Sequence, residues 1–112
     1  MTGINRQITL DFKHIAKHLQ NTPQSKRLLN RGRAAHVFID ETTMNSVART
    51  IIEVGEFTGT IREYDRYGMF FDQPIGYRVS HDGTRTLLYY GEIKVNASGQ
   101  YHVIPRTGSS QK

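Results

Sequence analysis

The chain contains no cysteine among its 112 residues. This absence excludes a disulfide framework and a thiolate metal site, so the fold depends on an ordinary apolar core. Long hydrophobic runs are absent as well. None approaches the roughly 18 residues that cross a bilayer, and the N-terminus lacks the charged-then-apolar pattern of a signal peptide. We therefore expect no membrane partner, and any export would depend on residues outside this sequence.

Acidic residues are in the minority: 15 Lys and Arg face 10 Asp and Glu, which gives a formal net charge of +5. Such a balance favours an acidic partner, and nucleic acid is the commonest one, although small proteins can also be basic for solubility alone. The length fits one domain spanning 1–112 with a single modest core. Residues 1–10 and 107–112 are expected to fray.

Three segments of the first half have apolar residues at helical spacing. Asp11 caps the first, and Thr22 caps the second, which Gly32 stops. Asp40 caps the third, which ends at Gly55. The third segment carries one apolar face, made of Met44, Val47, Ala48, Ile51 and Ile52.

The second half consists of short runs rich in aromatic and β-branched residues, which predict strands. Asp82-Gly83 is a type I′ hairpin signal, and residues 96–99 form a second hairpin loop. Residues 36–39 fit either a brief strand or an extended connection. The predicted fold is α+β, with N-terminal helices packed on one face of a four- to six-stranded antiparallel sheet. The predicted strands are 57–66, 67–71, 76–80, 85–90, 92–95 and 101–104.

The last strand carries His102 and, further on, Arg106. Imidazole transfers protons near neutral pH, and guanidinium clamps phosphate, so the pair suggests chemistry on a phosphodiester. Alternation places His102 with Ile104 on one sheet face, but does not say which face meets the helices. A half-buried structural histidine is the competing interpretation.

His18 and Lys17 provide a second candidate group. On a helical wheel both lie away from the apolar stripe of the first predicted helix, so His18 is expected to reach solvent or a groove edge. A solvated helix face explains the same pattern. His14 and His18 have the spacing of a metal clip, but no third ligand is evident, so we expect neither a metal nor another cofactor.

Basic residues interleave with tyrosines through much of the chain. Positive charge binds phosphates and exposed rings stack on bases, a combination that single-stranded RNA requires, although most of the tyrosines also fit core packing. The candidate phosphate-binding residues are Arg33, Arg66, Arg85 and Arg106.

Several blocks, taken in order, resemble the bacterial toxin 50 family of polymorphic-toxin RNase domains. Residues 17–22, with Lys26 beyond, resemble its "KHI-x-GT…K" opening, and residues 31–38 resemble its "GKS" segment before a strand. Residues 75–83 match "IGxY…G", and residues 102–105 resemble the closing "HIVPA". Two departures stand out: Ala34-Ala35-His36 replaces the family's hydroxyl residue, and Asn21-Thr22 replaces its "GT".

The resemblance implies the barnase–EndoU–colicin–RelE fold and metal-independent cleavage of RNA, with tRNA or rRNA as the expected substrate. It implies active-site roles for Lys17, His18 and His102, and a cognate immunity protein as partner. Such a domain acts in the cytoplasm of the target cell and can be delivered as the C-terminal part of a secreted toxin.

These observations support the hypothesis of an endoribonuclease in which one of His18 and His102 accepts the ribose 2′-OH proton and the other protonates the 5′-leaving oxygen. Lys17, Arg33, Arg85 and Arg106 would stabilise the phosphorane. Two alternatives remain: a non-catalytic nucleic-acid-binding domain, and an inactive toxin-like domain that binds a partner protein.

Overall fold

Helix α2 (Glu41–Val54) is the helix that the described residues contain. The computed structural model describes residues 3–4, 6–10, 18–19 and 34–109, so the predicted helices after Asp11 and Thr22 largely lie outside the described residues. Asp40 caps α2 as predicted, because its carboxylate accepts a hydrogen bond from the Thr43 amide at 2.7 Å. The predicted apolar face is confirmed, with Met44, Val47, Ala48 and Ile51 buried.

Gly55 ends α2 for a steric reason. Its backbone is extended, with φ −65° and ψ 156°, so no left-handed conformation demands glycine. A Cβ at this position would instead lie 2.6 Å from Ile51 Cγ2 and 2.7 Å from the Ile51 carbonyl oxygen. The glycine therefore allows the chain to turn closely against the last turn of the helix.

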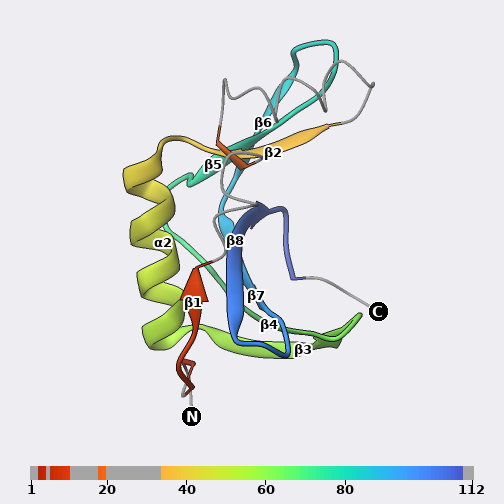
Figure 1. Cartoon of the computed structure of the whole chain (residues 1–112). Helices are drawn as coiled ribbons and strands as arrows, with labels where there is room; N and C mark the ends of the chain where they lie inside the picture. Colours follow the sequence, from red (N-terminus) through yellow and green to blue (C-terminus); the bar gives the residue numbers. More distant parts are fainter. Residues whose placement is uncertain (1–2, 5, 11–17, 20–33, 110–112) are drawn as a thin grey trace.

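The strands of the described residues form two sheets, whereas the sequence predicts one (Figure 1). The larger has the order β1-β8-β7-β4-β3, with α2 on one of its faces. Its strands are β1 (Thr9–Leu10), β3 (Glu56–Ile61), β4 (Tyr64–Phe70), β7 (Tyr90–Val95) and β8 (Gln100–Arg106). All its pairs are antiparallel except β1 with β8, which is parallel. The α+β class and the packing of a helix on a sheet are confirmed.

The smaller sheet has the order β2-β5-β6 and lies beyond one end of β8 (Figure 1). It comprises β2 (Ala35–Phe38), β5 (Gly76–Val79) and β6 (Arg85–Leu88), so residues 36–38 of the segment 36–39 lie in a strand and Ile39 follows it. The chain changes sheets at Tyr89, the single residue between β6 and β7. The Tyr89 carbonyl accepts a hydrogen bond from the Phe71 amide at 2.8 Å, and the Leu88 carbonyl accepts one from Ile75 at 2.8 Å. This change of sheet explains why the predicted single antiparallel sheet is the wrong topology.

Both predicted hairpins form, but the turn type predicted for the first is wrong. The Gly83 amide donates to the Ser80 carbonyl and the Ser80 amide donates to Thr84, which makes a three-residue loop with Gly83 at φ 91°. A type I′ turn would need positive φ at Asp82 also, and only Gly83 has it. The loop at 96–99 has the same pattern, closed by Gly99 at φ 81°.

A two-residue turn at Arg62-Glu63 divides the segment that the sequence predicts as one strand over 57–66. Ile61 pairs with Tyr64, and the two residues between them have φ values of 54° and 68°. These angles define a type I′ turn, for which asparagine and glycine are the preferred residues. Neither is present, so no turn signal appears in the sequence.

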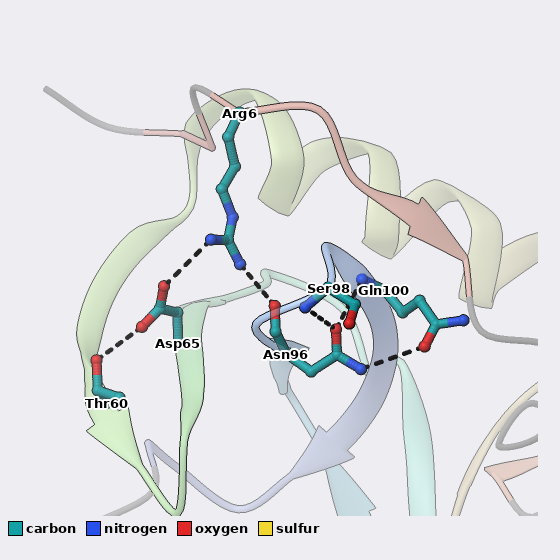
Figure 2. A network of polar contacts seen from close by, with 6 residues as sticks. All are labelled: Arg6, Thr60, Asp65, Asn96, Ser98 and Gln100. Atoms are coloured by element: carbon teal, nitrogen blue, oxygen red, sulfur yellow. Dashed lines mark hydrogen bonds and ion pairs between the residues drawn. The ribbon is translucent and has the colours of Figure 1, made fainter.

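Residues 1–10 are expected to fray, yet their described part is attached to the domain (Figure 2). Arg6 donates to the Asn96 carbonyl at 3.0 Å and lies 3.8 Å from the Asp65 carboxylate. Asp65 in turn accepts a hydrogen bond from Thr60 at 2.7 Å. Arg6 therefore links the N-terminal segment to both the β3–β4 hairpin and the β7–β8 turn.

Candidate functional site

The two faces of the five-stranded sheet differ in chemistry. Ile93, Val95 and Val103 belong to the apolar core that includes residues of α2. Because side chains alternate along a strand, Glu92, Lys94 and His102 lie on the opposite face. We call this surface the polar face; its members are Tyr64, Arg66, Gly68 and Phe70 of β4, Tyr90, Glu92 and Lys94 of β7, and His102, Ile104 and Arg106 of β8.

Glu92 is the centre of the polar face and is completely buried, with 0% of its surface exposed. Its Oε1 accepts a hydrogen bond from Arg66 Nη1 at 3.0 Å and another from Arg106 Nε at 2.7 Å. The Arg66 side chain is 7% exposed and that of Arg106 is 32% exposed. One carboxylate thus holds two guanidiniums from the neighbouring strands, and the trio keeps a net positive charge.

His102 lies on the polar face beside an aromatic ring and an ammonium group. Its imidazole packs edge-on against Tyr64, with ring centroids 5.8 Å apart. Lys94 is directly opposite His102 in the β7–β8 register, and its Nζ lies 4.9 Å from the Tyr64 ring centroid. His102 itself is 7% exposed. The sequence does not determine which face of the sheet His102 occupies; in the structure, His102 lies on the face away from α2.

Tyr90 occupies the other end of the polar face. Its ring lies above Gly68, where a side chain would collide with the phenol, and packs edge-on against Phe70 at 4.7 Å. Burial raises the pKa of the Tyr90 phenol, and the negative charge of Glu92 raises it further. Phe70 is 65% exposed, so this end of the face presents an apolar rim.

His18 is buried, with 7% exposure, so it does not lie on an open solvated face; its position at a groove edge stays a prediction. His18 and Leu19 are not α-helical; Leu19 forms a parallel bridge with Phe38, so the helical wheel does not apply here. The Nδ1 of His18 lies 2.8 Å from the His36 carbonyl oxygen. Since a carbonyl only accepts, Nδ1 carries the proton and Nε2 is the basic nitrogen.

His36 on β2 lies where the smaller sheet meets β8. It is opposite Arg78 of β5 in the register, and both β2 and β5 contact β8. Burial lowers the pKa of the His36 imidazole, and the charges of Arg106 and Arg78 lower it further. The ring is therefore neutral at pH 7.

The structure brings together only some of the residues that the sequence singles out. Arg66, His102 and Arg106 share the polar face, whereas His18 is attached to the smaller sheet through His36. Arg85 is opposite Val79, so it projects from the other face of the smaller sheet than Arg78 and covers Tyr77, 5.2 Å from the ring centroid. Lys17 and Arg33 lie outside the described residues.

Glu92 and His36 are the groups that sequence reasoning missed. The sequence gives no sign that Glu92 is buried, because its alternation with Gly91 and Ile93 only places it on the face opposite the core. No motif surrounds His36; its neighbours Arg78 and Arg106 come from distant strands. Among the residues that the structure describes, no group of three His, Asp or Glu side chains could hold a metal ion. No helix in this part of the chain is long and apolar enough to span a membrane.

The site thus belongs to an α+β domain whose sheet carries a buried carboxylate–guanidinium trio on the face away from its helix. Residues 6–110 match the family described as a domain of unknown function, DUF6972, and the chain belongs to that family. No curated protein matches the chain. No solved structure matches it either.

Proposed function

We propose that this domain is a metal-independent endoribonuclease of the toxin type, with a barnase- or RelE-like arrangement of helix and sheet. The observation that carries the proposal is the polar face, where two guanidiniums hold one buried carboxylate and His102 and Lys94 lie on the same side of the sheet. Its excess of positive charge suits a phosphodiester, and its imidazole suits proton transfer. The ordered resemblance to the toxin 50 family and the net charge of +5 give independent support.

In this mechanism the ribose 2′-oxygen attacks the adjacent phosphorus and the 5′-oxygen leaves, which gives a 2′,3′-cyclic phosphate. His102 is the proton-transfer group on the polar face. His18, held at the smaller sheet through the His36 carbonyl, is the candidate for the second group, with Nε2 as its basic atom. Arg106, the more exposed guanidinium of the trio, contacts the phosphate. Glu92 is a positioning residue, because it is fully buried and orients Arg106 and Arg66. We further propose that the domain binds a cognate immunity protein and acts in the cytoplasm of a target cell.

A second candidate function is a non-catalytic RNA-binding domain. The burial of both His18 and His102, each 7% exposed, favours it, since satisfied structural histidines are buried in the same way. This function needs the positive charge and the exposed rings but no proton transfer.

The test is incubation of the protein with tRNA and rRNA in EDTA, followed by mapping of the cleaved ends. We expect 2′,3′-cyclic phosphate ends, and a loss of about 10²–10⁴-fold in rate for His102→Ala and for His18→Ala. His81→Ala in the exposed β5–β6 turn is the matched control and should cleave normally. Full activity in both variants would contradict the mechanism. Salt-sensitive binding of RNA without any cleavage would establish the second candidate.

A further inference from the structure

The junction of the two sheets brings together three strands, each of which carries an imidazole or a guanidinium side chain. His36 comes from β2, Arg78 from β5 and Arg106 from β8. His36 and Arg78 are a cross-strand pair, and β8 contacts both of their strands. None of the motifs considered in the sequence includes His36 or Arg78 as a binding group.

The geometry points to a phosphate subsite formed by His36, Arg78 and Arg106, which holds a phosphate group of the RNA next to the one that is cleaved, with Arg106 shared between the two phosphates. This inference rests on the proposed function for the identity of the ligand. The subsite itself depends only on the chemistry of the three side chains.

The contact with Glu92 orients the guanidinium of Arg106 so that it can bind an anion. That contact uses Nε, at 2.7 Å, and fixes the plane of the guanidinium. Among the described residues, nothing hydrogen-bonds to its two terminal nitrogens, and the side chain is 32% exposed. Arg106 therefore presents oriented donors to solvent.

Arg78 supplies the second charge. Its Nη1 donates to the Ser80 hydroxyl at 3.3 Å, a neutral partner that leaves the positive charge uncompensated. The residue opposite Arg78 on β6 is Thr86, which is also neutral. Among the described residues, Glu92 is the acidic group that contacts this set, and it is shared with Arg66.

His36 completes the subsite as a neutral donor. Burial, together with the charges of Arg106 and Arg78, holds its pKa below the ordinary value of 6.5. A bound phosphate would reverse the effect of the two cations and favour the protonated ring. The imidazole should therefore take up a proton more readily when phosphate is bound than when the subsite is empty.

Two probes test the subsite without any cleavage. Inorganic phosphate, titrated into the ¹⁵N-labelled protein, should shift the amides of residues 36, 78 and 106 together. A single-stranded 2′-O-methyl RNA, which cannot undergo 2′-oxygen attack, tests whether the subsite binds a phosphodiester as well as free phosphate. We expect Arg78→Gln to weaken binding of both probes about tenfold. The matched control is Arg49→Gln on the exposed face of α2, which should change phosphate binding less than twofold.

His36→Gln is the second variant, because it keeps a hydrogen-bond donor and leaves both guanidiniums in place. It should retain phosphate binding at pH 8 and lose the increase that the wild type gains as the pH falls. Equal effects of Arg78→Gln and Arg49→Gln, or phosphate shifts spread over the whole surface, would overturn the inference. Binding of phosphate but not of the 2′-O-methyl RNA would identify a site for a free phosphate compound instead. If the probes bind as expected and RNA is never cleaved, the subsite stands and the nuclease proposal fails.

Discussion

Arg106 on β8 donates from its Nε to Oε1 of Glu92 on the neighbouring strand β7, at 2.7 Å. Because Arg106 also lies close enough to His36 to lower its pKa, this contact connects the buried carboxylate of the larger sheet with an imidazole of the smaller one. The charges of the two sheets are therefore coupled at their junction.

Replacing Glu92 with glutamine should lower the free energy of unfolding by about 3–5 kcal/mol, because it leaves two guanidiniums close together without their carboxylate. Urea denaturation measures the change. Asp65→Asn is the matched control, since it removes a carboxylate whose ion pair with Arg6 is exposed, and it should cost less than about 1 kcal/mol. Equal losses in the two variants would show that the buried trio contributes no more to stability than the ion pair between Arg6 and Asp65.

Stability should fall in mild acid because of His36. Its folded-state pKa is lowered from 6.5, so as the pH falls through that value the unfolded chain binds a proton that the native protein does not. The stabilisation that is present above pH 6.5 is therefore lost progressively as the pH falls from 6.5 to the folded-state pKa. Comparing wild type with His36→Gln by urea denaturation at pH 7.5 and pH 5.5 isolates this contribution. A variant with the same pH dependence as the wild type would contradict it.

The turn at Arg62-Glu63 should be improved by replacement with Asn-Gly. Both residues adopt left-handed conformations, with φ 54° and 68°, which residues with a side chain rarely favour. We expect a gain of about 1 kcal/mol in the free energy of unfolding. The same pair placed at Ala97-Ser98, where neither residue has positive φ, is the control and should bring no gain.

Gly68→Ala should disturb the polar face. A Cβ at this position would lie 2.7 Å from Tyr90 Cε2, so the phenol ring must move away from residue 68, which disturbs its packing on Phe70. Overpacking of this kind costs about 1–3 kcal/mol. Gly108→Ala has no atom within 4 Å of the added methyl group and serves as the control. Near-ultraviolet circular dichroism should change in the first variant only.

Sequence reasoning succeeded where the determinants are local. Asp40, the apolar face of α2 and the loop at 96–99 each depend on residues within a few positions of one another. The Arg62-Glu63 turn was missed because its residues carry no turn preference. The pairing of β3 with β4 on either side of the turn imposes its conformation.

The division into two sheets could not be predicted from periodicity. Residues 85–95 are a nearly continuous strand pattern, and only Tyr89 separates the part that pairs with β5 from the part that pairs with β4 and β8. Similarly, the burial of Glu92 depends on Arg66 and Arg106, whose approach is fixed by register between strands. Local sequence patterns do not specify that register.

The parallel pairing of β1 with β8 has a consequence for the order of folding. Thr9 pairs with Gln100, and the Arg6–Asn96 hydrogen bond spans 90 residues of sequence. Contacts so distant in the chain form late, because closing the intervening loop costs entropy that only a preformed sheet edge offsets. During synthesis on the ribosome, β1 therefore cannot pair until β8 has emerged, and only then is the larger sheet complete.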